Sequence, residues 1–164
     1  MEQEKTKDFK GTIIVGDSRT ANIEDRLHHF GIDKVQFVIY HPPYWDIIKF
    51  SDNEKDLSNC NSLEEFNQSF GEVIDNTSRY LEKNRYCACV IGDKYANSEI
   101  VPLGFYCMNL FLSRGFKLKA ILVKNFEDTK GKSNQKAIWR YRALASDFYL
   151  FKHEYIFVFK KVKK

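Results

Sequence analysis

The residues best suited to chemistry form the tetrapeptide His41-Pro42-Pro43-Tyr44, which Trp45 follows directly. Two consecutive prolines remove two backbone donors and fix two φ angles, so the carbonyls before them can be aimed rigidly at an amino group. Tyr44 supplies a flat ring on which a nucleic-acid base can stack. A proline-rich turn closed by an aromatic side chain would have the same sequence, and the tetrapeptide alone does not decide between a binding site and a turn.

Apolar runs and segments of helical period alternate along the chain and predict the elements that position the tetrapeptide. Apolar runs bounded by turn residues predict strands at 12–16, 35–40, 85–92, 116–123 and 154–160. Helical periodicity predicts helices at 21–30, 62–82 and 103–114. In the longest of these, Ser62 and Glu65 form a capping box.

The alternation of strands and helices predicts an α/β domain with a mostly parallel sheet. The last two strands are joined by no long helix, so they are expected to form an antiparallel pair. In an open α/β sheet, ligands bind at the carboxyl ends of the strands. The tetrapeptide follows the predicted strand 35–40 directly, so it lies at such an end.

A basic segment between the last two strands is the main electrostatic signal. The whole chain of 164 residues carries a net charge of +4, which is a weak sign of nucleic-acid binding. Residues 124–142 contain two acidic residues against six basic ones, Lys124, Lys130, Lys132, Lys136, Arg140 and Arg142. A basic polar loop interleaved with Trp139 and Tyr141 suits contact with phosphates, although an ordinary solvated loop has a similar composition.

The composition excludes several classes of protein. Hydrophobic residues make up 43% of the chain and aromatic residues 15%, which is enough for a packed core and excludes a disordered chain. No apolar run approaches the roughly 20 residues that span a bilayer, and residues 1–10 lack a signal-peptide pattern. The four cysteines show no zinc spacing. We therefore expect one soluble, cytoplasmic domain over 1–164, with 1–10 as a disordered tail, no metal and no membrane partner.

The order of these pieces resembles the amino-methylating DNA methyltransferases, which use S-adenosyl-L-methionine to methylate N6 of adenine or N4 of cytosine. That family carries Asp/Asn/Ser-Pro-Pro-Tyr/Phe at the end of its fourth strand, the place that His41-Pro42-Pro43-Tyr44 takes here. Residues 14–19 (IVGDSR) look like the third-strand segment, whose acidic residue can bind the adenine of the cofactor. Further segments similar to the family follow in the same order, at 56–59, 90–93, 102–105 and 151–156. The resemblance therefore covers about residues 11–160.

The resemblance implies a Rossmann-like methyltransferase sheet, a catalytic half at 11–160 and a reaction without metal. A flipped base would stack on Tyr44, while the Pro42 carbonyl and the side chain of His41 accept hydrogen bonds from its amine. The implied catalytic residues are His41, Pro42, Pro43 and Tyr44. The implied cofactor-binding residues are Asp17, His41 and Pro42. DNA would be bound by Trp45, Lys130, Lys132, Lys136, Arg140 and Arg142. RNA remains an alternative substrate, and the biological role stays open between restriction-modification, regulation and a mobile element.

Two departures from the family pattern shape the functional prediction. A neutral imidazole at His41 can accept one hydrogen bond but an imidazolium cannot, and His41 gives no clue to adenine or cytosine. The eight glycines stand apart, so the family's Gly-rich cofactor turn is missing. Of the family order 3-2-1-4-5-7-6, the sequence supplies only strands 3 to 7, with a gap of two strands between 12–16 and 35–40.

We therefore expect a second polypeptide, or a homo-oligomer, to complete the cofactor site, and a truncated gene product is the alternative to such a split enzyme. The alternative is a catalytically inactive methyltransferase-like subunit that binds nucleic acid or a partner methyltransferase. Other polar residues receive structural interpretations: a surface position for His28 and His29, a structural role for His153-Glu154, and a core position for Cys87 and Cys89. Asp93 is either a polar group near the site or a turn residue.

Overall fold

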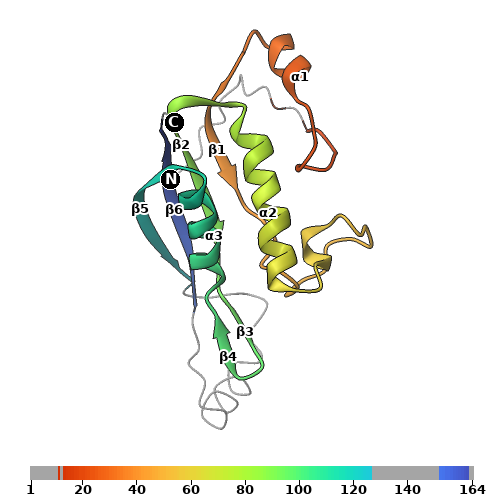
Figure 1. The fold of residues 1–164 in the computed structure, drawn as a ribbon, viewed down its shortest axis with the longest axis vertical. Coiled ribbons are helices and arrows are strands. Elements are labelled where there is room, and N and C mark those ends of the chain that lie inside the picture. The colour runs from red at the N-terminus through yellow and green to blue at the C-terminus, as the bar shows by residue number, and fades with distance from the viewer. Residues whose placement is uncertain (1–10, 12, 127–151, 163–164) are drawn as a thin grey trace, which may run out of the picture.

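Helices and strands alternate along the part of the chain that the computed structural model describes, which is residues 11, 13–126 and 152–162. The elements in chain order are α1 (Glu24–His29), β1 (Val35–Tyr40), the 3-10 helix η1 (Leu57–Asn59), α2 (Leu63–Ser78), β2 (Leu81–Ile91), β3 (Lys94–Ala96), β4 (Glu99–Val101), α3 (Leu103–Ser113), β5 (Phe116–Asn125) and β6 (His153–Lys161). Figure 1 shows how they are arranged.

Four strands form one sheet in the order β1-β2-β6-β5. β1 and β2 are parallel, whereas β6 is antiparallel to both β2 and β5. The mixed α/β class and the antiparallel C-terminal pair are therefore confirmed. Because β6 runs against its neighbours, its first residues lie at the same edge of the sheet as the carboxyl ends of β1, β2 and β5.

Helices α2 and α3 pack against the same side of this sheet; in Figure 1, α3 lies in front of the strands and α2 lies beside β1. The side chains of that face are fully buried on β2 (Cys87, Cys89, Ile91) and on β6 (Phe157, Phe159). Phe111 of α3 lies at the centre of the core. Its ring stacks on Phe159 with centroids 4.4 Å apart and meets Tyr40 edge to face at 5.1 Å.

Helix α2 begins as the sequence predicts but ends sooner. The Ser62 hydroxyl accepts a hydrogen bond from the Glu65 amide at 3.1 Å, as in a capping box, while the Glu65 carboxylate accepts from the Asn61 amide. The helix ends at Ser78, and β2 starts at Leu81, so the predicted end at 82 is wrong. Leu81 continues the helical period of α2, but it pairs with Val35 of β1 and therefore belongs to the sheet.

The predicted strand at 12–16 is also wrong for its described residues, 13–16, which lie in no strand. β-branched residues favour a strand only where a neighbouring strand satisfies the backbone hydrogen bonds. In the described part of the chain, β1 pairs with β2 alone and nothing pairs with this segment. Ile13 and Val15 are accordingly 93% and 95% exposed.

A short hairpin, which the sequence does not predict, follows the carboxyl end of β2. β3 and β4 pair through a turn at Asn97 and Ser98, whose φ angles of 53° and 63° suit a tight two-residue hairpin. The hairpin projects beyond the carboxyl end of β2, at the bottom of Figure 1, opposite α1. Within the described residues, no helix has both the length and the apolar character needed to cross a membrane.

Replacing Phe111 with alanine tests the aromatic core. We expect Phe111→Ala to lower the free energy of unfolding by about 3–5 kcal/mol, because a fully buried ring is lost and its neighbours cannot close the cavity. Urea unfolding followed by circular dichroism measures the change. Leu112→Ala, a neighbour on α3 that is 39% exposed, is the control and should cost about 1 kcal/mol or less. Equal losses in the two variants would contradict this view of the core.

Candidate active site

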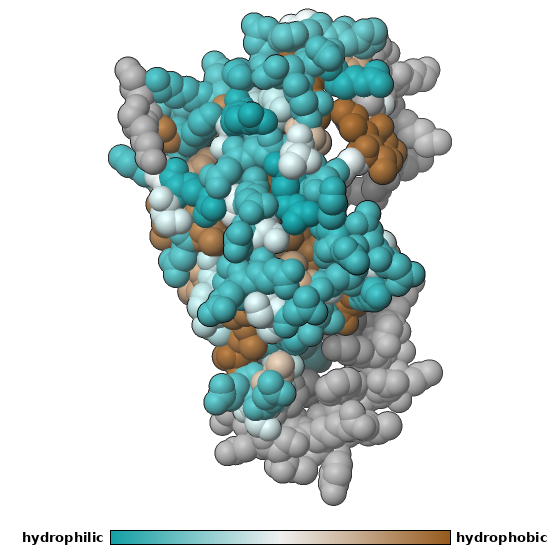
Figure 2. Space-filling view, turned by 45° about the vertical axis from the view of Figure 1, so that its right-hand side comes forward, coloured by the Kyte–Doolittle hydropathy of each residue, from teal (hydrophilic) through white to brown (hydrophobic). Residues whose placement is uncertain are grey.

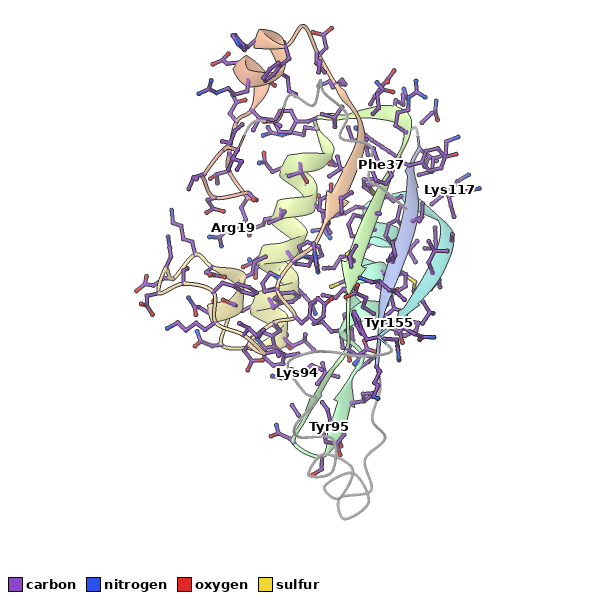
Figure 3. The ribbon with its side chains drawn as sticks, turned by 180° about the vertical axis from the view of Figure 1, so that it is seen from behind. Arg19, Phe37, Lys94, Tyr95, Lys117 and Tyr155 are labelled. Carbon is purple, nitrogen blue, oxygen red and sulfur yellow. The ribbon has the colours of Figure 1, made fainter. Side chains whose placement is uncertain are left out.

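The carboxyl edge of the sheet brings together residues that are far apart in the sequence. His41-Pro42-Pro43-Tyr44 follows β1, Gly92 and Asp93 follow β2, and Lys124 lies near the end of β5. Glu154, the second residue of β6, pairs in register with Lys124. Figure 3, which views the sheet from the other side, labels Tyr155 and Lys94 at this edge. The sheet order thus makes a single site from the ends of four strands.

The tetrapeptide leaves the sheet as a turn with one exposed end. Pro42 is buried and Pro43 is half-buried, whereas His41 is exposed. The rings of His41 and Tyr44 are 6.0 Å apart and tilted by 46°. All four residues predicted to be catalytic therefore border one place, with the two proline rings as the anchored part and His41 free to meet a ligand.

Tyr44 is held by both its hydroxyl group and its ring. The hydroxyl donates a hydrogen bond of 2.6 Å to Oε2 of Glu154. The ring lies so close to Gly92 that a Cβ there would come within 2.8 Å of Cε2 of Tyr44. Burial, and next the Glu154 carboxylate, raise the pKa of Tyr44 above its usual value, so the side chain is a neutral phenol at neutral pH.

Trp45 makes contacts within the protein that its position in the sequence does not predict. Its indole N–H donates to the Cys60 carbonyl at 2.9 Å, and the Lys94 ammonium lies 4.1 Å from the centre of its ring. Lys94 is itself paired with Asp46. The backbone of Trp45 has a φ of 54°, in the left-handed region. DNA binding by Trp45 stays a prediction. In the structure, its ring already makes a cation–π contact with Lys94.

A cavity of about 470 Å³ opens beside the tetrapeptide. It is lined by His41, Pro42, Pro43, Tyr44, Ile47, Ile48, Phe50 and Asp56. The apolar wall is open to solvent, since Ile47, Ile48 and Phe50 are 48%, 60% and 68% exposed. Figure 2 shows that hydrophobic residues reach the surface in several places on a mainly hydrophilic side of the molecule. A flat, partly apolar ligand would fit this cavity.

A second cavity, of about 370 Å³, adjoins the first, because Pro43 and Asp56 line both. It also contains Asp17, the predicted cofactor-binding residue, whose carboxylate accepts hydrogen bonds from the Arg19 side chain at 3.0 Å. The hydrogen bond from Arg19 lowers the pKa of Asp17. Burial opposes the ionisation of Asp56, but hydrogen bonds from Ser58 and Ser51 outweigh it and lower its pKa. Two ionised carboxylates therefore face this cavity.

Other polar residues singled out in the sequence lie elsewhere or have structural roles. Asp93 accepts a hydrogen bond from the Gly104 amide at 2.9 Å, and so caps α3. His28 and His29 are exposed as expected, and Cys87 and Cys89 are buried as expected. Five predicted DNA-binding residues lie outside the described residues, namely Lys130, Lys132, Lys136, Arg140 and Arg142. Among the residues described, no cluster of His, Cys, Asp and Glu could hold a metal ion.

Sequence reasoning missed two members of the site, Glu154 and Gly92. The sequence predicts a structural role for Glu154, yet the residue is buried and accepts a hydrogen bond from Tyr44. An acidic residue at the start of an otherwise apolar and aromatic strand was the available signal, because a buried carboxylate needs partners. The sequence does not show that these partners are Tyr44, which follows β1, and Lys124, which lies on β5.

Solved structures share this fold over nearly the whole chain. TTHA0409 of Thermus thermophilus, provisionally named a DNA modification methylase, has a TM-score of 0.57 and 20% identity, covering 92% of this chain and 53% of that one. Its complex with S-adenosyl-L-methionine gives a TM-score of 0.57 and 19% identity, covering 92% and 55%. The cytosine-N4-specific PvuII DNA methyltransferase gives 0.52 and 13%, covering 79% and 43%.

A family comparison goes further than the likeness of fold. The model of the N6/N4 DNA methylase family matches residues 35–164, which is more than half of the chain and includes the tetrapeptide and every strand of the sheet. The chain therefore belongs to the N6/N4 DNA methylase family, as the sequence resemblance predicted. It spans about half the length of the solved structures that it matches. No curated protein matches the chain.

The ion pair in the second cavity predicts a pH-dependent contribution to stability. Because the folded protein lowers the pKa of Asp17, its stabilisation is fully present above the unfolded pKa of about 4 and is lost as the pH falls through the folded pKa. Urea midpoints measured from pH 7 to pH 3 should show the largest gap between the wild type and Asp17→Asn at neutral pH, closing on acidification. Arg19→Met should behave in the same way. A gap independent of pH would contradict the pairing.

Proposed function

We propose that the chain is the catalytic half of a DNA methyltransferase that modifies the exocyclic amine of adenine (N6) or cytosine (N4). The observation that carries the proposal is the rigid turn His41–Tyr44 at the carboxyl edge of the sheet, open to a cavity that Tyr44 helps to line. Membership of the DNA methylase family supports the same reaction. Because the chain spans about half of its structural relatives, the activity of a complete enzyme is part of the proposal.

The residues of the site suit a neutral, planar substrate. Pro42 has a fixed φ, and its carbonyl is held between two proline rings, so it can accept a hydrogen bond from the amine of the base. His41 is exposed beside it and can accept a second one when its imidazole is neutral. Tyr44 presents a ring that is kept uncharged. Such a site orients an amine and contributes to the rate mainly through positioning.

The two adjoining cavities fit S-adenosyl-L-methionine in part. The ionised carboxylates of Asp17 and Asp56 can accept hydrogen bonds from an adenine amine or from ribose hydroxyls, and Leu57, Val73 and Pro43 supply apolar wall. When bound, the cofactor would supply a methyl group activated by its sulfonium. Residues suited to its methionine end are missing from the sequence, which has no Gly-rich turn. We propose that a second polypeptide or a second copy of the chain supplies them.

DNA is the proposed macromolecular substrate. The basic residues at 130–142, namely Lys130, Lys132, Lys136, Arg140 and Arg142, would contact phosphates, and Trp45 would lie close to the flipped base. At the edge of the sheet, Lys94 and Lys124 are already paired with the carboxylates of Asp46 and Glu154. The phosphate-binding role in this proposal therefore falls to the basic residues at 130–142. An inactive subunit that only binds nucleic acid is the second candidate, which the histidine at position 41 favours.

Methyl transfer by Tyr44 variants tests the proposal. The protein, with any polypeptide that co-purifies, is incubated with tritiated S-adenosyl-L-methionine and unmethylated genomic DNA, which contains all short sequences. We expect incorporation into N6-methyladenine or N4-methylcytosine. Tyr44→Ala should reduce it about 100-fold because the stacking surface is lost. Tyr106→Ala, on the exposed side of α3, is the control. Full activity of a folded Tyr44→Ala protein would rule out the assigned role of Tyr44, and DNA binding without transfer would favour the inactive subunit.

Calorimetry tests the need for a second polypeptide. The isolated chain, once shown to be monomeric, should bind S-adenosyl-L-methionine with a Kd of about 1 mM or weaker, because only the adenosine end finds residues suited to it. Addition of the completing polypeptide should tighten binding by at least about 10-fold. Micromolar binding by the monomer would show that the chain builds the cofactor site by itself.

A further inference from the structure

The hydroxyl group of Tyr44 is fixed by a residue 110 positions away. It donates to Oε2 of Glu154 at 2.6 Å, a short distance typical of a hydrogen bond to a charged acceptor. Tyr44 follows β1, whereas Glu154 is the second residue of β6, and the two strands are separated in the sheet by β2. The hydrogen bond therefore crosses the carboxyl edge of the sheet beyond the end of β2, where the chain turns at Gly92.

Glu154 is a buried carboxylate with both oxygens in use. Its side chain is 7% exposed, and Oε1 accepts a hydrogen bond of 2.8 Å from the ammonium of Lys124, which is 57% exposed. Burial alone would favour the neutral acid, but the hydrogen bonds from Lys124 and Tyr44 outweigh burial and lower the pKa of Glu154. A buried charge costs free energy unless it is paired, so its retention beside Tyr44 calls for a role.

The ring of Tyr44 is restrained on a second side by Gly92. Even a single methyl group at Gly92 would come within 2.8 Å of the ring, so the backbone there serves as a close support. A hydrogen bond at the hydroxyl end and a backbone contact along the ring together leave the side chain little rotational freedom. A stacking surface needs this property, because a ring already ordered loses no rotamer entropy when a base arrives.

We infer that Glu154 is a positioning residue, which fixes the ring of Tyr44 as the surface on which the target base stacks, with Lys124 as the partner that holds the Glu154 carboxylate. The inference rests on the proposed function and deepens it. Glu154 and Lys124 need not touch the base, because they act through the hydroxyl group of Tyr44. This arrangement also gives Glu154 a role that its place near the start of β6 does not by itself explain.

A double-mutant cycle between Tyr44→Phe and Glu154→Gln tests the inference in the methyl-transfer assay. Each single variant should lower kcat about 10-fold while KM for S-adenosyl-L-methionine stays within about 2-fold. If Glu154 acts only through the hydroxyl group, the double variant should also be about 10-fold slower, whereas independent effects would multiply to about 100-fold. Glu99→Gln, an exposed carboxylate on the neighbouring hairpin, is the control and should match the wild type.

Lys124→Met provides a second test if Glu154→Gln does not fold. It leaves Glu154 in place and removes the partner on the exposed side, so kcat should fall in the same direction, by about 3-fold or more. Lys117→Met, an exposed lysine at the opposite end of β5, is the matched control (Figure 3). Wild-type kcat in a folded Lys124→Met or Glu154→Gln protein would overturn the inference.

Tyrosine titration gives a readout that needs no activity. With ring-labelled tyrosine, the signal of Tyr44 among nine tyrosines is the one missing from Tyr44→Phe. Glu154→Gln should lower the pKa of Tyr44 relative to the wild type, because burial remains while the carboxylate no longer opposes the phenolate. An unchanged pKa would overturn the inference while leaving the proposed function intact. A wild-type protein that transfers no methyl group even together with its completing polypeptide would instead overturn the proposed function, and the inference with it.

Discussion

The insertion of β6 between β2 and β5, antiparallel to both, is the constraint on which the rest of the structure depends. Its inner residues Phe157 and Phe159 are fully buried, and the ring of Phe159 stacks on Phe111 of α3 at the centre of the core. The same strand sets the geometry of the site. Its reversed direction places the start of β6 among the carboxyl ends of the other three strands, so a residue late in the chain reaches a turn that follows β1.

The site is built for positioning more than for acid-base chemistry. Two prolines fix the backbone, and a hydrogen bond to Glu154 and the close support of Gly92 fix the ring of Tyr44. Three ion pairs lie around it, Asp17 with Arg19, Lys94 with Asp46 and Lys124 with Glu154. The proposed transfer to a neutral amine needs alignment of the reacting atoms and exclusion of competing geometries, and rigid, uncharged surfaces suit both.

The described sheet is covered by helices on one face only. On the other face, seen in Figure 3, Phe37 and Ile39 of β1 are 49% and 66% exposed. Within the described residues, β1 is also an edge strand, with one side of its backbone unpaired. Unpaired edges and apolar faces are a liability in an isolated sheet. These features agree with the proposal that a second polypeptide or a second copy of the chain completes the domain. The unpaired edge of β1 leads directly to the turn His41–Tyr44.

The sequence by itself determined what local chemistry controls. Apolar runs bounded by turn residues predicted all four strands of the sheet, Ser62 and Glu65 predicted the start of α2, and the paired prolines predicted a rigid turn after β1. The resemblance of short motifs in order predicted the family. These predictions succeeded because propensity, capping and proline geometry act over a few residues. The hairpin turn at Asn97 and Ser98 is also local, but its strands of three residues are too short to produce a pattern.

Only the tertiary structure decided the rest. The β-branched run at 13–16 has strand propensity but pairs with no strand among the described residues, whereas Leu81 fits a helical period but pairs with β1 in the sheet. The sequence predicts only a structural role for Glu154, whereas the sheet order brings Tyr44 and Lys124 to its two carboxylate oxygens. In each case the deciding contact joins segments distant in the sequence. Strand pairing and the partners of a buried charge depend on how the whole chain is packed, and no local pattern encodes them.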